Sequence, residues 1–240
     1  MGTVALGEND VHLWYVQSDG VRDPATLERF AALMAPAERA RHDRFVFEKD
    51  RHQFLVTRGM VRTLIGRYLG VDPADCAFVA NAYGRPSLSW PAGAPLAFNL
   101  SHTNGLVVCA FAREGDIGVD VEAADRAIGL ELARRFFSRE EADALEALPE
   151  AERPARFLDY WTLKEAYIKA RGMGLSLPLD GFSIQLDSLR PGIRFTPAID
   201  DDPDAWQLVR LRPTPRHHLA LAVRRRGADR AIQLRELRVE

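Results

Sequence analysis

Two carboxylates in the segment GVDVE, Asp120 and Glu122, have the type and spacing that suit a metal site. They alternate with Val119 and Val121, so in a strand both project from one face, about 7 Å apart along the chain. Two like charges beside buried valines repel each other unless a cation neutralises them, and Mg²⁺ commonly binds one or two carboxylates together with waters and substrate phosphates. The alternative is that the strand simply presents its solvent face at these positions.

Glu165 and Lys169 stand four residues apart in a segment with helical spacing, where the default expectation is an exposed ion pair. Glu165 follows Trp161 by one turn, however, which places the pair at the edge of the buried face of the helix. We therefore expect Glu165 to join Asp120 and Glu122 as a third carboxylate. Lys169 would then neutralise a phosphate beside them.

Ser101 and His102 lie in FNLSHTNG, where an apolar segment is interrupted by small polar residues, and we expect a loop tip there. Adjacent residues on an extended chain point to opposite faces, so a local pair of nucleophile and base is not expected. Two interpretations remain. Either Ser101 caps the turn and His102 faces solvent, or His102 donates a hydrogen bond to a phosphate.

A basic segment between residues 39 and 52 straddles the start of a predicted helix, where free backbone amides and the helix dipole favour an anion. Arg85, held next to Pro86 in YGRPSL, could add a further cation to the same anion. The alternative to anion binding is that this run of charges forms a solvated face, as such runs usually do. The basic residues of the segment are Arg39, Arg41, His42, Arg44, Lys49, Arg51 and His52.

The elements that must position these side chains follow from periodicity and from start and stop signals. Pro24 and Pro36 suit the first turns of helices, Gly70 and Gly172 end the two long ones, and Ser138 opens a capping box. We expect helices over 24–34, 36–43, 48–68, 139–147 and 153–171, and a turn over 81–88. Strands are expected over 11–16, 76–80, 98–102, 105–113, 117–122, 182–186, 206–211, 218–223 and 232–237.

Each half of the chain therefore reads as a long helix followed by several strands, and the segments GLVVCAFAR and HLALAVRRR are loosely alike. This pattern indicates duplication. We predict an α+β fold in which two similar halves form a pseudo-twofold pair, each with a long helix packed on a small, mainly antiparallel sheet. The halves would span residues 1–114 and 115–240, with the active site at their junction.

Composition limits the possible partners and compartments. The 240 residues carry 32 basic and 34 acidic side chains, so bulk electrostatic binding to nucleic acid or anionic lipid is not expected. Cys76 and Cys109 sit in apolar stretches, as core thiols in a reducing compartment do. No apolar run approaches the roughly 18 residues of a membrane helix, and the N-terminus lacks the pattern of a signal peptide. We expect a cytoplasmic protein with neither nucleic acid nor membrane as its partner.

The ordered motifs FNLSHTNG, GVDVE, RFFSREE and WTLKEAYIKARGMGLSLPL, from about residue 98 to 185, resemble the signature of surfactin-type 4'-phosphopantetheinyl transferases. YGRPSL and the basic region extend the likeness upstream. The resemblance implies two α+β halves with coenzyme A bound between them. It also implies Mg²⁺-dependent transfer of the 4'-phosphopantetheine arm of coenzyme A to a serine of an apo acyl or peptidyl carrier protein, releasing adenosine 3',5'-bisphosphate. Polyketide, nonribosomal peptide and fatty acid carriers all remain open. The length, which is that of the two-half members, implies a monomer.

The same resemblance implies roles for individual residues. Asp120, Glu122 and Glu165 match the metal ligands, Glu165 also matches the base, and Lys169 matches the catalytic lysine next to the pyrophosphate. Residues implied to bind coenzyme A are Arg41, Arg85, Ser101, His102 and Lys169. Glu38 departs from the pattern because some members have a second phosphate-binding lysine there. Arg44 or Lys49 would compensate for that lost charge.

Two other functions are weaker alternatives. A serine hydrolase would need a distant acid and histidine to partner Ser101, and the chain has no G-x-S-x-G elbow. A non-catalytic coenzyme A or nucleotide-binding module would keep the basic residues but would need no site with three carboxylates. Binding of coenzyme A without metal-dependent turnover would favour the module.

Overall fold

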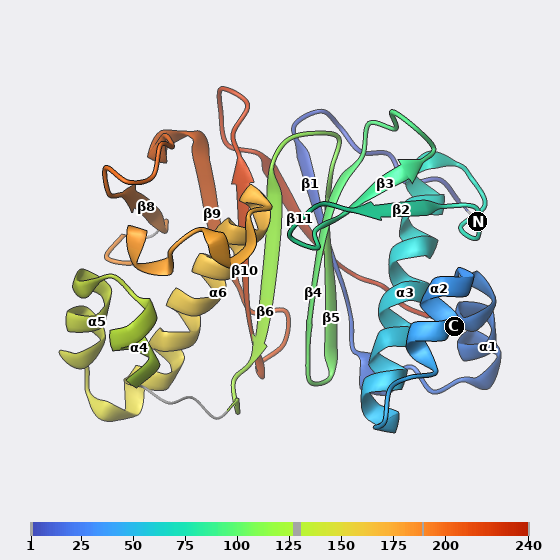
Figure 1. Ribbon diagram of the computed structural model, residues 1–240, viewed down its shortest axis with the longest axis horizontal. Coiled ribbons are helices and arrows are strands. Elements are labelled where there is room, and N and C mark those ends of the chain that lie inside the picture. The colour runs from blue at the N-terminus through green and yellow to red at the C-terminus, as the bar shows by residue number, and fades with distance from the viewer. Residues whose placement is uncertain (1, 127–130, 189, 240) are drawn as a thin grey trace.

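The computed structural model describes residues 2–126, 131–188 and 190–239. Figure 1 shows strands in the middle of the molecule, with α3 toward one side and α6 toward the other. Among the described residues, no helix is both long and apolar enough to cross a membrane. The first half contains β1 (Asp10–Val16), α1 (Pro24–Leu33), α2 (Pro36–His42), α3 (Glu48–Leu69), β2 (Ala77–Ala80), β3 (Pro86–Trp90), β4 (Ala97–Thr103) and β5 (Leu106–Ala112).

The second half continues directly from β5 into a new strand. It contains β6 (Ile117–Ala123), α4 (Glu131–Phe136), α5 (Arg139–Glu146), α6 (Arg153–Arg171), β7 (Phe182–Gln185), β8 (Gly192–Phe195), β9 (Trp206–Leu211), β10 (His217–Arg224) and β11 (Ala231–Glu236). The α4 helix, β3 and β8 were not expected from sequence. All three are short, and in β3 the turn-like sequence ends at Arg85, after which Pro86 begins the strand.

The strand order repeats between the halves. One sheet has the order β11-β1-β5-β4 and the other β6-β10-β9. In the first half β5 pairs antiparallel with both β1 and β4, and in the second half β10 pairs antiparallel with both β6 and β9. A long helix and a two-stranded hairpin, β2–β3 or β7–β8, lie between them in the chain. The predicted α+β fold of two similar halves is therefore confirmed, and β5 and β10, the segments with similar sequences, are the equivalent central strands.

The final strand departs from this repeat. β11 pairs in parallel with β1, with Asp10 opposite Ala231 and Tyr15 opposite Glu236. The C-terminal end of the chain thus adds a fourth strand to the sheet of the first half, a contact that no local sequence pattern specifies.

The core has three parts because the central strands are apolar on both faces. Odd residues of β5, such as Val107 and Phe111, pack with α3, whereas even residues, such as Leu106 and Val108, belong to the cluster between the two sheets. The strand β10 contributes Leu219, Leu221 and Val223 to the same central cluster. Burial on both faces explains the continuous apolar runs of these strands.

Side chains of β4 join the two sheets along their facing edges. The Oδ1 atom of Asn99 accepts a hydrogen bond from the backbone N–H of Val119 at 2.9 Å, and Oγ1 of Thr103 accepts one from the backbone N–H of Ala123 at 3.2 Å. Between them, the hydroxyl of Ser101 donates to Asp120. Because the strands belong to different sheets, Asn99 and Thr103 supply partners for two backbone N–H groups of β6, and Ser101 adds a hydrogen bond to the carboxylate of Asp120.

The helix α6 lies directly against β6, and Gly118 makes this approach possible. A Cβ atom at position 118 would lie 2.0 Å from the carbonyl oxygen of Ala166 and 2.4 Å from the backbone nitrogen of Ala170. Both atoms belong to the backbone of α6, so they cannot rotate away as a side chain could. Any larger residue must move the helix.

We therefore expect Gly118→Ala to lower the free energy of unfolding by about 1 to 3 kcal/mol, as overpacking of a close contact does. Gly20→Ala is the matched control, since nothing lies within 4 Å of its added Cβ. Urea unfolding followed by circular dichroism measures both. Equal stability of the two variants would contradict the close contact between α6 and β6.

Candidate active site

Three carboxylates meet where β6 faces α6. Val119 and Val121 point into the central cluster, so the intervening Asp120 points toward α6 and is only 5% exposed. Glu122 and Glu165 are half-buried at the same place. The alternation of β6 and the helical position of Glu165 thus bring together the three acids singled out from sequence.

Lys169 and Ser101 compensate the charge of Asp120. The Oδ1 atom of Asp120 accepts hydrogen bonds from Lys169 Nζ at 2.6 Å and from Ser101 Oγ at 2.9 Å. Lys169 Nζ also donates to Ser101 Oγ at 2.9 Å. Lys169 therefore pairs with Asp120 across the helix–strand contact. The other carboxylate oxygen, Oδ2, is buried and has no hydrogen-bond partner among the described residues.

The pKa values of the two glutamates are raised at this place. Burial and the nearby charge of Asp120 raise the pKa of Glu165, and the same two causes raise the pKa of Glu122. Glu122 forms an ion pair with Arg126 and accepts a long hydrogen bond from Thr103. Glu165 forms no hydrogen bond with the described residues. A negative potential therefore concentrates between β6 and α6.

These observations test whether a hard divalent cation would suit the three acids. In the described part of the chain, no three His, Cys, Asp or Glu side chains are already arranged around one metal position. The unpartnered oxygen of Asp120 and the raised pKa values of Glu122 and Glu165 are nevertheless what such a cation would relieve. The oxygen donors and their charge fit Mg²⁺.

Two adjoining cavities open at this point. The smaller, about 300 Å³, is lined by Glu165, Lys169 and Arg85, among others. The larger, about 710 Å³, is lined by residues of α2, α3, the β2–β3 hairpin and β4. Leu100 borders both, as do Gly84 and Pro86. An elongated ligand could therefore extend from the acids into the larger cavity.

Basic side chains line the larger cavity. Arg41 and His102, both expected from sequence, lie there together with Arg58 of α3, which was not. Partial burial and the charges of Lys169 and Arg58 lower the pKa of His102. Arg58 could not be recognised from sequence because it follows Phe54 by one turn in a helix with many charged residues, and nothing local shows which of these face a cavity.

The expectation of a loop tip at Ser101 and His102 was wrong. They lie inside β4, not at a loop tip, and the turn falls at Asn104 and Gly105. Gly105 has φ of 77°, which a glycine adopts readily. Ser101 is buried and bonds Asp120, so it does not cap a turn. Polar residues interrupt this strand because they bond across to β6.

The remaining predicted cations are placed differently. Arg44 is exposed and lines neither cavity. Lys49 lines a separate cavity of about 570 Å³ near Ser18 and His52. Neither stands beside Glu38 in the larger cavity.

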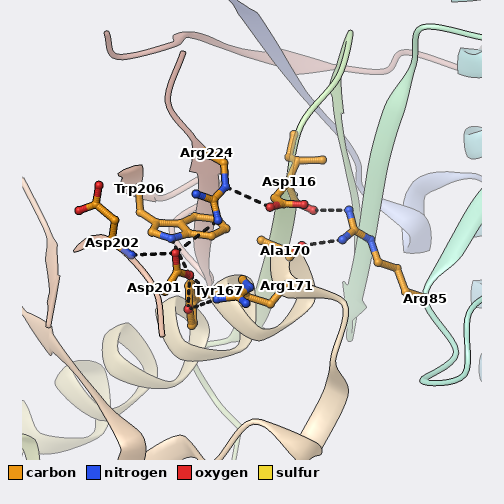
Figure 2. Close-up of polar contacts among 10 residues, drawn as sticks. Arg85, Asp116, Tyr167, Ala170, Arg171, Asp201, Asp202, Trp206 and Arg224 are labelled. Atoms are coloured by element: carbon orange, nitrogen blue, oxygen red, sulfur yellow. Dashed lines mark hydrogen bonds and ion pairs between the residues drawn. The ribbon is translucent and has the colours of Figure 1, made fainter. Parts of the chain in front are cut away.

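Arg85 reaches from the β2–β3 hairpin to the second half. Its guanidinium donates to the carbonyl oxygen of Ala170 at 2.5 Å and to that of Ile117 at 3.2 Å (Figure 2). Asn81 adds a hydrogen bond to the carbonyl of Gly172 at 2.8 Å. The hairpin is therefore fastened to the end of α6 and the start of β6, and these contacts fix one wall of the smaller cavity.

Asp201, whose side chain is buried, bonds to residues in the last turns of α6. Asp201 accepts hydrogen bonds from the hydroxyl of Tyr167 at 2.7 Å and from Trp206 Nε1 at 3.0 Å, and it pairs with Arg171 (Figure 2). Arg224 extends the network from Asp201 to Asp116. No local pattern predicts this cluster, because its members come from α6 and from loops and strands that are distant in the chain. It helps to fix the helix that carries Glu165 and Lys169.

Comparisons with known proteins identify the family of this chain. Residues 116–223 match the model of the 4'-phosphopantetheinyl transferase superfamily, and residues 23–114 match that of the 4'-phosphopantetheinyl transferase N-terminal region. The chain is 36% identical over 223 residues to the 4'-phosphopantetheinyl transferase HetI of a Nostoc species, covering 92% of this chain and 90% of HetI. It is 39% identical over 159 residues to the 4'-phosphopantetheinyl transferase Sfp of Bacillus subtilis, covering 66% and 69%.

A solved structure, the holo-[acyl-carrier-protein] synthase of Thermotoga maritima, is similar at 20% identity with a TM-score of 0.39, over 46% of this chain and 63% of that one. On the family models and the sequence relatives, this chain belongs to the 4'-phosphopantetheinyl transferase superfamily. It is an enzyme, a 4'-phosphopantetheinyl transferase.

The raised pKa of Glu165 predicts a pH-dependent effect of Glu165→Gln on stability. A carboxyl group whose pKa is raised on folding stabilises the fold below its unfolded pKa of about 4.3, and this contribution is lost as pH rises through the folded pKa. Glutamine mimics the protonated form. We therefore expect the metal-free variant to be more stable than the parent at pH 7.5, with the difference shrinking toward pH 4.5.

Urea unfolding with a chelator present, at several pH values, measures this difference. The control is Glu28→Gln on the exposed face of α1, which should show no such gain. A Glu165→Gln variant that is less stable than the parent at pH 7.5 would contradict the electrostatic interpretation.

Proposed function

We propose that this enzyme transfers the 4'-phosphopantetheine arm of coenzyme A to a serine hydroxyl of an apo acyl or peptidyl carrier protein, with Mg²⁺ as cofactor. The observation that carries the proposal is the meeting of Asp120, Glu165 and Lys169 beside two adjoining cavities, the larger one basic. The names of the relatives support the same reaction.

The reaction is a displacement at phosphorus. The serine oxygen of the carrier forms a bond to the phosphorus that bears the pantetheine arm. The bond from that phosphorus to the bridging oxygen breaks, and its electron pair leaves with adenosine 3',5'-bisphosphate. The serine proton must pass to a base. Little covalent chemistry is left to the protein, so positioning and charge stabilisation dominate.

Glu165 suits the role of base. Its pKa is raised by burial and by Asp120, which increases its affinity for a proton, and it has no hydrogen bond with the described residues to compete for that proton. Lys169, held by Asp120 and Ser101, lies where its ammonium group can stabilise phosphate charge. A bound Mg²⁺ would be held by Asp120, Glu122 and Glu165 and would offset negative charge on the pyrophosphate oxygens.

The two cavities would hold different parts of coenzyme A. The reacting pyrophosphate belongs in the smaller cavity with Glu165 and Lys169, and the nucleotide end belongs in the larger one with Arg41 and His102. For Arg85, the bonds to two backbone carbonyls support a positioning role alongside the phosphate contact expected from sequence.

Several finer features belong to the same proposal. We expect a monomer that works in the cytoplasm, because both halves of the site are supplied by one chain and both cysteines are free and buried. The carriers would serve polyketide, nonribosomal peptide or fatty acid synthesis. Neither nucleic acid nor a membrane is needed for the reaction.

Incubation with coenzyme A, Mg²⁺ and a panel of apo carrier proteins tests the function. Intact-mass measurement should show one phosphopantetheine group added to at least one carrier, and none when a chelator replaces Mg²⁺. Tight binding of coenzyme A with no carrier modified would instead support a non-catalytic binding module.

The base assignment predicts that Glu165→Gln separates binding from chemistry. Coenzyme A should still bind, while transfer should fall by about 10²-fold to 10⁴-fold, the usual effect of losing a positioned base. Single-turnover transfer with enzyme in excess and coenzyme A saturating measures the chemical step. Glu28→Gln again serves as the control. A Glu165→Gln rate within about threefold of the parent would leave less than about 1 kcal/mol of the barrier to this carboxylate and would exclude it as the base.

A further inference from the structure

A further cavity, of about 770 Å³, lies between β9 and β11, the edge strands that end the two sheets. Residues 207–212 of β9 and its end form one wall, and Arg230 and Ile232 line the cavity from the other sheet. Asp120 and Glu122 belong to β6, at the opposite edge of the three-stranded sheet, with β10 between β6 and β9. Among the described residues, none lines both this cavity and a cavity of the active site. It is therefore a separate site.

The lining of this cavity carries more positive than negative charge. Its ionisable side chains in the described part of the chain are five arginines and two aspartates, an excess of three positive charges. Each aspartate is already shared between two of the arginines. Asp159 bonds Arg210 at 2.8 Å and Arg212 at 3.0 Å, and Asp229 bonds Arg190 at 2.6 Å and Arg225 at 2.8 Å. Asp159 also bonds Nδ1 of His218 at 2.9 Å, which commits its charge further.

Arg230 is the fifth arginine, and it forms no ion pair with the described residues. It is only 3% exposed, and its Nη2 atom donates to the backbone carbonyls of Glu8 at 3.2 Å and Asp10 at 3.3 Å. Its Nε and Nη1 atoms are buried without a hydrogen-bond partner among the described residues. Burial and the nearby charge of Arg226 lower the pKa of Arg230. A buried cation with two unpartnered donors lacks the anion that such a group needs.

The chemistry of the lining selects the kind of anion. A guanidinium group forms paired hydrogen bonds with phosphate oxygens, and a phosphate-type anion concentrates two or more charges in one group. That charge matches an excess of three better than a single carboxylate does. Leu208, Pro191 and Ile232 add apolar surface to the same cavity. Cavities of this size hold small molecules, so there is room for an organic group beside the phosphate.

We propose that this cavity binds a phosphate-bearing anion, with Arg230 as its main ligand-binding residue and the other four arginines completing the site. The anion accepts hydrogen bonds from Nε and Nη1 of Arg230 and neutralises the excess charge between β9 and β11. It thereby strengthens the contact between the two sheets at the edge opposite the active site. The inference goes beyond the proposed function and does not depend on it.

Calorimetry tests this site with pyrophosphate as the probe. The enzyme is saturated with coenzyme A, without metal or carrier protein, so that the active site is already occupied. The parent should bind one pyrophosphate per chain. Arg230→Gln should weaken this binding at least about tenfold, the effect of losing charged hydrogen bonds.

Arg212→Ala is the second variant, because Arg230 is buried and its replacement could prevent folding. The Arg212 side chain is 45% exposed, and without it Asp159 keeps Arg210 and His218 as partners. This variant should fold and should also bind pyrophosphate more weakly than the parent. Arg139→Ala on α5 is the matched control, since that side chain is 93% exposed, and it should leave the affinity unchanged.

Adenosine 5'-diphosphate, as a second probe, distinguishes the two sources of such an anion. Binding tighter than that of pyrophosphate, and weakened by the same two variants, would assign the site to the phosphate of an organic molecule. Equal binding of the two probes, again weakened by both variants, would assign it to a free inorganic anion. Failure of the parent to bind either probe would overturn the proposal. So would affinities that are the same in the parent, Arg230→Gln and Arg212→Ala.

Discussion

The buried carboxylate of Asp120 links the fold to the chemistry. An ionised group that is 5% exposed must be compensated, and its partners come from two directions: Ser101 from β4 of the first half and Lys169 from α6 of the second. The bonds that the Asp120 carboxylate accepts therefore also hold β4, β6 and α6 together. Its second oxygen has no hydrogen-bond partner among the described residues, which leaves it free to bind a cation.

The rotation of α6 about its own axis determines which of its charged side chains face Asp120. Lys164, one residue before Glu165, is fully buried on another face, where it pairs with Glu141 at 2.8 Å and donates to the carbonyls of Leu179 and Phe182. Successive helical residues are about 100° apart, so fixing Lys164 in the core turns Glu165 toward the cavity. The contact at Gly118 sets the distance between helix and strand, and the network of Asp201 holds the last turns.

Most of the elements could be predicted from sequence because their signals are local. The helix over 153–171 was predicted with its observed bounds, and Asp120 and Glu122 followed from alternation in one strand. Features that depend on distant partners could not be predicted. The pairing of β11 with β1 needs contacts more than 200 residues apart in the chain, and Arg58 reads as one charge among many until α2 packs against α3. Ser101 looked like a loop residue because the bonds that justify a polar side chain in β4 cross to another sheet.

The strand β4 shows why the site lies at the junction of the halves. Its residues alternate between two tasks, because successive side chains of a strand point in opposite directions. Asn99, Ser101 and Thr103 bond β6, whereas Leu100 and His102 line the larger cavity. The same strand therefore fastens one half to the other and forms part of the wall of the larger cavity. A shift of β4 by one residue would exchange these faces. Leu100 would then lie against the carboxylate of Asp120, and Ser101 would lie in the cavity. Both the site and the bonds between β4 and β6 would be lost.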